Sequence, residues 1–230
     1  MDIEPFIERC FMMKILIVLI NTLFFLNMSS YSADVLNSKQ QESFLRDMSC
    51  QLKGIKNFKV EFEQQRHLSI MFEPLISKGV CYFEKPDKMR WEISSPYSSI
   101  LIYNSDQVAK YEIENGKINK LNFGAADIMR KVLQQIISWM QGDFNEADGL
   151  YALEVYKGSV YKVVLIPISE AMRTNLQKIE LHITVQDFQM NEVVIRESET
   201  DFIQIKFMNK QDNIALPEKV FDPAMPVNLQ

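Results

Sequence analysis

The chain has 230 residues, of which 47% are apolar and 24% are charged, so it can bury a substantial core and is not intrinsically disordered. Its 30 Asp and Glu residues outnumber its 25 Lys and Arg residues, which leaves a formal net charge of −5. Because this negative field repels phosphate backbones, we expect no nucleic-acid partner.

The first residues have the features of a secretory signal peptide. Lys14 precedes the apolar run 15–26, and small residues follow at 29–33, as signal peptidase requires. The run is shorter than the roughly 20 apolar residues of a membrane-spanning helix, although a retained membrane anchor is the alternative. We therefore predict a signal peptide over 1–33 and a mature domain over 34–230.

Two further features of this segment refine the prediction. The stretch before Met12 carries three acidic residues and a single Arg, which is the wrong charge for the start of a signal, so translation is expected to begin at Met12 or Met13. Bacterial lipoproteins carry their lipid on a Cys directly after the apolar run, whereas the next Cys here is Cys50. We therefore expect a periplasmic protein without a lipid tether.

Cys50 and Cys81 are the Cys residues that remain after the predicted cleavage. An exported protein can keep a disulfide, so these two residues are a candidate pair. Two buried thiols are the alternative. Neither residue is assigned a catalytic role, because no Cys-x-x-Cys spacing is present.

The mature domain begins with a predicted helix and continues with predicted strands. Apolar residues at helical spacing predict a helix over 38–52. Phe58, Val60 and Phe62 then alternate with charged residues, which indicates a strand with one buried face. Further short strands, separated by turn residues, are predicted at 80–83, 89–93, 99–103, 108–113 and 117–123.

A predicted amphipathic helix over 125–141 interrupts the strands, and Gly142 can provide its left-handed end. One helical turn is expected at 169–174, and the Pro-rich segment 216–230 is expected to form an edge strand and a tail. The remaining strands are predicted at 151–156, 160–166, 179–185, 192–198 and 202–208.

These elements lie in one domain, since no linker or repeat divides the mature chain. The predicted fold class is mainly β (α+β). It is a single strongly curved, incompletely closed antiparallel β-barrel of about 10 to 11 strands, with helices covering its apolar mouth.

The sequence carries no pattern that is typical of catalysis. Neither His67 nor His182 lies in a metal-binding motif, and the chain has no nucleophile elbow, phosphate-binding loop or dinucleotide fingerprint. We therefore expect no enzymatic activity, no cofactor and no metal.

A curved sheet covered by an amphipathic helix could enclose an apolar cavity. On periodicity alone, an ordinary filled core is the simpler interpretation. The residues expected to line the cavity are Phe58, Val60, Phe62, Val80, Tyr82, Met89, Trp91, Ile93, Leu101 and Tyr103. The residues expected to form a lid over it are Ile128, Met129, Val132, Ile136 and Met140.

One part of the sequence resembles a known family. The segment 79–96 has a small residue, an aromatic-rich strand, a basic-Pro step, a Trp-containing strand and a Pro, and 99–106 follows as a strand with an Asp turn before Tyr111. Together with the Phe-x-x-x-Phe-x-Gln spacing of 58–64 and the segment 216–226, this order resembles the periplasmic outer-membrane lipoprotein carriers, the LolA family.

The resemblance implies an unclosed barrel with a helical lid over a cavity that receives the acyl chains of lipoproteins. It also implies loading by an inner-membrane ABC transporter and delivery to the outer membrane, where a dedicated acceptor is a candidate partner; we expect a monomer. The family's basic residue before the Pro is commonly an Arg that ties the lid to the barrel. That residue is Lys85 here, and Arg90 could take over part of its role.

Three alternatives to this function are kept. A tethered outer-membrane acceptor of similar fold is disfavoured by the missing lipidation Cys. A general periplasmic carrier of fatty acids or glycolipids would use the same cavity. A secreted, non-enzymatic interaction domain would instead have a filled core.

Overall fold

All described residues belong to the unit Asp34–Gln230. The predicted signal peptide lies outside them and stays a prediction. The computed structural model describes residues 34–105, 107–121, 135–144, 149–217 and 219–224.

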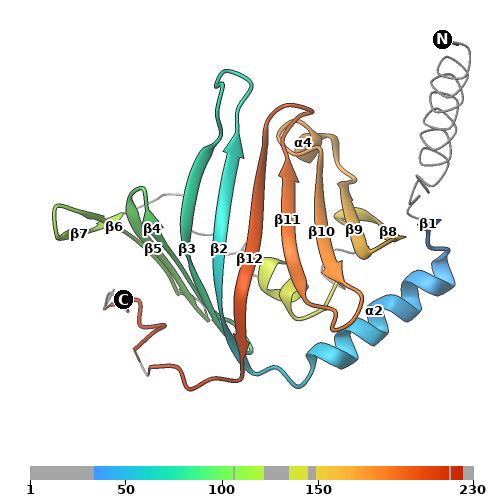
Figure 1. The fold of residues 1–230 in the computed structure, drawn as a ribbon, viewed down its shortest axis with the longest axis horizontal. Helices are drawn as coiled ribbons and strands as arrows, with labels where there is room; N and C mark the ends of the chain where they lie inside the picture. Colours follow the sequence, from blue (N-terminus) through green and yellow to red (C-terminus); the bar gives the residue numbers. More distant parts are fainter. Residues whose placement is uncertain (1–33, 106, 122–134, 145–148, 218, 225–230) are drawn as a thin grey trace, which may run out of the picture. The chain divides into compact units, whose positions relative to one another are not determined.

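The described residues contain 12 β-strands, which form one antiparallel sheet (Figure 1). In chain order the strands are β1 (Asp34–Val35), β2 (Asn57–His67), β3 (Leu75–Glu84), β4 (Lys88–Ser95), β5 (Ser98–Asn104), β6 (Gln107–Glu114), β7 (Lys117–Leu121), β8 (Tyr151–Lys157), β9 (Val160–Pro167), β10 (Lys178–Thr184), β11 (Met190–Arg196) and β12 (Phe202–Asp212). Within the sheet they are ordered β1-β8-β9-β10-β11-β12-β2-β3-β4-β5-β6-β7.

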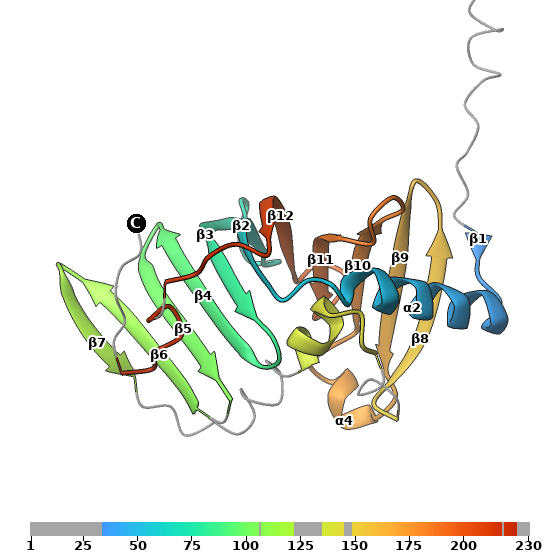
Figure 2. The ribbon, with the colours of Figure 1, turned by 90° about the horizontal axis from the view of Figure 1, so that it is seen from below.

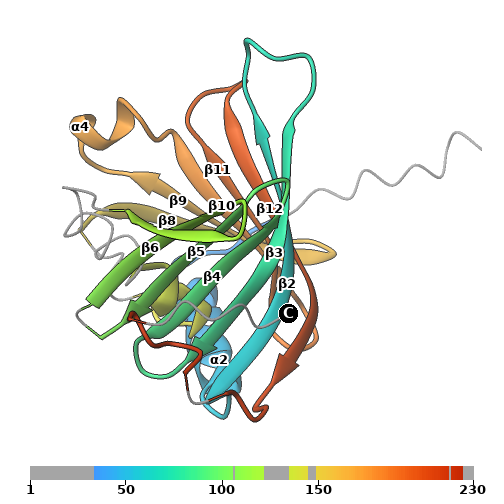
Figure 3. The ribbon, with the colours of Figure 1, turned by 90° about the vertical axis from the view of Figure 1, so that its left-hand side faces the viewer.

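The sheet is strongly curved and open (Figure 3), which confirms the predicted fold class. Its edges are β1 and β7, which do not pair with each other in the described part of the chain. The strand count is 12 rather than about 10 to 11. The difference includes β1, whose two residues pair with the end of β8 through Asp34 and Lys157 and are too few to show a period in the sequence.

The central strand β2 follows from its alternating sequence. Phe58, Val60 and Phe62 are buried on one face, and the residues between them are more exposed. β2 pairs with β12 on one side and with β3 on the other, so this strand joins the two halves of the sheet. Its buried face belongs to the inner, concave side on which the helices pack.

Helix α2 (Ser38–Leu52) packs on the half of the sheet that contains β8 to β10 (Figure 2). Asn37 begins the helix with a capping box: its side chain accepts from the Gln40 backbone N–H, and the Gln40 side chain accepts from the Asn37 N–H. Phe44, Met48 and Leu52, spaced four residues apart, form its buried stripe.

Two further helical elements lie on the chain. Residues 135–140 form a helical segment that packs on the inner face of the sheet, within the predicted helix 125–141. Gly142 follows it with φ of 75°, the left-handed end that the sequence predicts. The predicted helical turn is α4 (Glu170–Arg173), which Ser169 caps.

The prediction of an edge strand within 216–230 is wrong for the described residues, which contain no strand beyond β12. Instead, residues 214–217 and 219–224, here called the C-terminal strap, cross the outer face of the sheet. Val220 and Phe221 are buried there against Tyr82, and the Asn104 side chain donates to the Phe221 carbonyl. Prolines in the strap cannot donate to a sheet ladder, so side chains rather than strand pairing hold it.

Candidate functional site

An apolar cavity of about 350 Å³ lies between the helical segment 135–140 and the inner face of the sheet. No charged side chain lines it among the described residues; its polar side-chain groups are those of two Gln, one Tyr and two Trp residues. The lining residues are Gln64, Met89, Trp91, Leu101, Gln135, Ile136, Trp139, Met140, Tyr151, Leu176, Ile179, Leu181, Met190, Val193, Ile195, Ile205 and Phe207.

One wall of the cavity comes from β4 and β5. Trp91 lies directly opposite Leu101 across the antiparallel ladder, so both side chains point to the same face. Met89 lies two residues before Trp91 and therefore faces the same side. The Trp91 ring also stacks on Phe62 at 3.9 Å between ring centroids, which fixes the indole at the base of the wall.

The opposite wall comes from β10, β11 and β12. Leu181 of β10 pairs with Val193 of β11, and Val193 pairs with Ile205 of β12. These three residues form one apolar row across three strands, on the cavity face. The sequence predicts all three strands, but the predicted site contains none of their residues. The alternation of apolar residues within each strand is the signal that could have identified this wall.

The helical segment closes the cavity from the inner side. Ile136 and Met140, one turn apart, line it together with the buried Trp139, while Ile137 is buried in a neighbouring core cluster. The Gln141 side chain donates to the Pro86 carbonyl at 3.2 Å, which ties the end of the segment to the turn between β3 and β4. The other predicted lid residues, Ile128, Met129 and Val132, lie outside the described residues.

Two of the polar groups in the cavity lining bond to each other. The Tyr151 hydroxyl donates to the Gln135 side-chain oxygen at 3.2 Å, and burial raises the pKa of Tyr151, which keeps the phenol neutral. Trp139 packs edge-on against Tyr151, and its buried indole N–H has no acceptor among the described residues. The cavity is therefore uncharged and suited to hydrocarbon.

A second, larger depression of about 780 Å³ runs along α2. Charged residues line it, among them Glu42, Arg46 and Lys53. Tyr151 lies between the two spaces and lines both. Because hydrocarbon is not stabilised by a charged lining, the smaller cavity is the better candidate for an apolar ligand despite its size.

Eight of the ten predicted cavity residues lie on the inner face of the sheet, either in the cavity lining or in the core cluster beside it. Met89, Trp91 and Leu101 line the cavity. Five others pack in the neighbouring core cluster on the same face: Phe58, Val60, Phe62, Ile93 and Tyr103. Phe58 and Val60 also line a small void of about 20 Å³ in that cluster.

The assignment of Val80 and Tyr82 to the cavity is wrong. Both lie on the outer face of β3, where they pack with the C-terminal strap. The inner face of β3 is instead formed by Gly79, Cys81 and Phe83, which lie opposite Phe62, Val60 and Phe58. Since both faces of β3 are buried and apolar, its period could not show which face points inward.

Neither predicted lid-closing base contacts the helical segment 135–140 by a hydrogen bond found in the described residues. Lys85 donates to the carbonyls of Leu52 and Lys53 at 3.1 and 3.4 Å, so it caps the end of α2, and burial lowers its pKa. Arg90 is fully buried on the outer face, where it pairs with Glu92 at 2.9 Å and donates to the Val220 carbonyl. These contacts join Arg90 to Glu92 of β4 and to the C-terminal strap, and a lid-closing role for Arg90 stays a prediction.

The candidate disulfide is absent from the structure, in which Cys50 and Cys81 are both free thiols. Cys50 is exposed on α2, whereas Cys81 is completely buried on the inner face of β3. Burial raises the pKa of Cys81 to about 12, so it stays a protonated, unreactive thiol. The alternative of a buried thiol thus holds for Cys81 alone.

The described residues contain no group of three or more His, Cys, Asp or Glu side chains that could hold a metal ion. None of their helices is both long enough and apolar enough to cross a membrane.

Several solved structures are similar to the chain over most of its length, at low sequence identity. A LolA superfamily protein, NE2245 of Nitrosomonas europaea, is 10% identical and covers 78% of this chain and 96% of its own, with a TM-score of 0.42. The Mycobacterium tuberculosis lipoprotein LppX is 8% identical over 79% of this chain and 99% of its own, with a TM-score of 0.45. The MucA/MucB complex of Pseudomonas aeruginosa matches at 11% identity over 79% of this chain and 60% of that one, with a TM-score of 0.45.

No curated protein sequence is significantly similar to the chain. A family model does match it: the model described as outer membrane lipoprotein carrier protein LolA aligns with residues 53–224. This range contains β2 to β12 and every strand that lines the cavity. The chain therefore belongs to the LolA family of outer membrane lipoprotein carrier proteins.

Proposed function

We propose that this protein is a periplasmic carrier that holds the acyl chains of lipoproteins in the cavity beneath the helical segment 135–140 and moves them from the inner to the outer membrane. The observation that carries the proposal is the uncharged, apolar cavity of about 350 Å³ between that segment and the curved sheet. Membership of the LolA family supports the same ligand class.

The size of the cavity sets how the ligand is held. Ligand cavities in proteins commonly measure about 300–1,000 Å³, so this one lies near the lower end of that range. Each buried methylene stabilises a complex by about 0.8 kcal/mol, and full burial of several acyl chains would oppose release. A small cavity that encloses part of the lipid keeps the cargo bound but releasable.

More hydrocarbon can enter the cavity only if the helical segment 135–140 moves away from the sheet. In this proposal the helix that contains Ile136 and Met140 swings outward when lipid enters and packs back when it leaves. The Gln141 to Pro86 hydrogen bond is a contact that such a movement would break. No nucleotide or metal takes part in the step at the carrier itself.

The proposed partners follow from this role. An inner-membrane ABC transporter loads the carrier, the cargo is an acylated lipoprotein, and an outer-membrane acceptor or the membrane itself receives it. The carrier acts as a monomer. A general fatty-acid or glycolipid carrier would use the same cavity and is separated from this role by the cargo, whereas a filled-core interaction domain does not account for the cavity.

The first experiment identifies the cargo. The protein is produced with its own amino terminus in a Gram-negative host, purified from the periplasm and analysed by native mass spectrometry and lipid extraction. We expect a triacylated polypeptide to co-purify. Recovery of free fatty acid or glycolipid in its place would favour the general carrier, and recovery of neither would contradict both.

A matched pair of variants then locates the binding site. Ile136→Glu places a charge in the cavity lining and should abolish cargo binding, because a buried, unpaired carboxylate disfavours hydrocarbon beside it. Ile118→Glu, on the edge strand β7 with half of its side chain exposed, should bind cargo as the wild type does. Circular dichroism checks that both variants keep the sheet.

The tryptophans provide a direct optical readout. The chain has two Trp residues, and both, Trp91 and Trp139, line the cavity. A brominated fatty acid that enters the cavity should therefore quench nearly all of the intrinsic Trp fluorescence. Unchanged fluorescence at saturating ligand would show that hydrocarbon does not reach this space.

A further inference from the structure

The loop between β2 and β3 carries a cluster of exposed apolar side chains, here called the apolar tip and made up of Ile70, Met71, Phe72, Leu75 and Ile76. Phe72 and Ile70 are almost completely exposed, at 109% and 88%, and the other three are exposed by more than 40%. Figure 1 shows the two strands extending beyond their neighbours to present this loop. Contiguous exposed apolar residues usually mark a binding surface.

The other end of the sheet lacks such a cluster. Because neighbouring strands are antiparallel, the turn between β4 and β5 and the end of β9 lie at the same end as the apolar tip, and they add exposed Tyr97 and Ile168. At the opposite end, Val35 and Val185 are the exposed large apolar side chains found in the described residues. Exposed apolar surface is thus concentrated at one end of the molecule's sheet.

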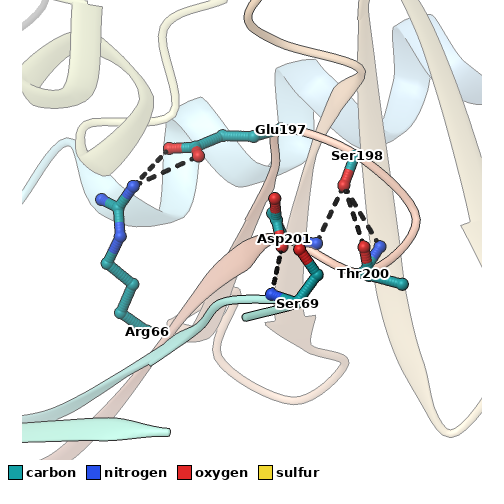
Figure 4. A network of polar contacts seen from close by, with 6 residues as sticks. All are labelled: Arg66, Ser69, Glu197, Ser198, Thr200 and Asp201. Atoms are coloured by element: carbon teal, nitrogen blue, oxygen red, sulfur yellow. Dashed lines mark hydrogen bonds and ion pairs between the residues drawn. The ribbon is translucent and has the colours of Figure 1, made fainter. Parts of the chain in front are cut away.

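Polar contacts hold the base of the apolar tip in place (Figure 4). Arg66 donates to both carboxylate oxygens of Glu197 at 3.2 and 3.3 Å, and the Ser69 backbone N–H donates to Asp201. The turn between β11 and β12 that supplies these acceptors is itself ordered, since the Ser198 hydroxyl accepts from the Asp201 N–H. A loop that is already fixed loses little conformational entropy when it binds.

We propose that the apolar tip inserts into the interface of a lipid bilayer. The tip is convex, with three consecutive apolar side chains at its apex, and such a shape enters a fluid interface without a matching pocket. Glu73 is the single charged residue in the segment 68–76, and the adjoining turn is acidic. The tip therefore suits a zwitterionic surface and gains nothing from anionic lipid.

This contact goes beyond the proposed carriage of lipoproteins, because it concerns the membrane itself and uses none of the cavity residues. The apolar tip and the cavity share no residue. Variants of the apolar tip can therefore test membrane insertion separately from cargo binding in the cavity, and either proposal can fail while the other holds.

Flotation with vesicles of pure phosphatidylcholine tests the insertion. The wild-type protein should float with the vesicles, and the double variant Ile70→Ser/Phe72→Ser should bind at least about tenfold more weakly, because two exposed apolar side chains are lost. The control Val185→Ser/Met208→Ser removes two exposed apolar residues away from the tip and should float as the wild type does. Replacing part of the lipid with phosphatidylglycerol should not strengthen binding.

A depth measurement distinguishes insertion from adhesion. Phe72→Trp adds a fluorophore at the apex that brominated phosphatidylcholine should quench, whereas Met208→Trp should give the wild-type level of quenching. Cargo binding by the double variant should remain normal. A wild-type protein that stays in solution, or a double variant that floats equally well, overturns the proposal, and the first result would assign the tip to a protein partner instead.

Discussion

Gly79 leaves room for the backbone of β4 and for the Phe62 ring beside β3. A Cβ atom at this position would lie 2.0 Å from the Glu92 carbonyl oxygen and 2.6 Å from the Phe62 ring. The ladder between the two strands shifts register at this residue, which brings the Glu92 backbone toward it. The Phe62 ring in turn stacks on Trp91, so the space that glycine leaves free supports a wall of the cavity.

Gly79→Ala should therefore lower the free energy of unfolding by about 2–3 kcal/mol, the usual cost of overpacking against backbone and a rigid ring. Gly54→Ala is the matched control, because a Cβ there meets no atom within 4 Å, and its stability should equal or slightly exceed that of the wild type. Urea unfolding followed by circular dichroism measures both. Equal midpoints for the two variants would contradict the close approach at Gly79.

The residue scale also shows what a sequence pattern can and cannot provide. Strand β2 alternates apolar with charged residues, so its inward face, Phe58, Val60 and Phe62, could be predicted and is buried in the structure. Strand β3 has apolar residues on both faces because the C-terminal strap covers its outer side. Hydrophobicity alone then cannot show which face of β3 points inward, and the prediction that Val80 and Tyr82 line the cavity is wrong for this reason.

At the scale of elements, Lys85 connects the turn after β3 to the end of α2. Its ammonium donates to two of the last carbonyls of the helix, groups that have no partner within the helix itself. The family resemblance instead predicts that this residue closes the lid. The contacts in the structure favour an anchor for α2, and the two roles predict different consequences of substitution.

Lys85→Met should lower the free energy of unfolding by about 1 kcal/mol, because two hydrogen bonds to helix carbonyls are lost, and should leave cargo binding unchanged. Lys85→Arg keeps a cation and its donors and should restore most of the stability. Thermal unfolding and the quenching of Trp fluorescence by brominated fatty acid report the two properties separately. If Lys85→Met had normal stability but no longer bound the ligand, the lid-closing role of Lys85 would be supported instead of the anchoring role.

The elements themselves could be predicted better than their arrangement. Short strands, the helix 38–52 and an amphipathic helix before Gly142 all follow from periodicity and turn residues. The cavity, in contrast, is built by strands from both halves of the chain, such as β4 and β11, which neither local period nor spacing brings together. The C-terminal strap is held by side-chain packing, which requires no regular period in the sequence, so its path over the outer face could not be predicted from periodicity.

At the scale of the whole molecule, the two faces of the sheet have different tasks. The inner face carries α2, the helical segment 135–140 and the cavity. The outer face of β3 to β5 is covered by the C-terminal strap, which buries the ion pair of Arg90 and Glu92 and accepts a hydrogen bond from that Arg. A buried pair of this kind is costly when its surroundings are removed, so the strap is expected to contribute to stability.

Phe221→Ala should therefore lower the free energy of unfolding by about 3 kcal/mol, since it removes a buried aromatic ring from the outer face, yet leave the affinity for brominated fatty acid unchanged. Met140→Ala, on the inner face, should weaken ligand binding with a smaller loss of stability, because this side chain lines the cavity and is only partly buried. Both affinities are measured well below the unfolding temperatures. If Phe221→Ala weakened binding as much as Met140→Ala does, the two faces would be coupled, and the strap would belong to the binding mechanism as well as to the scaffold.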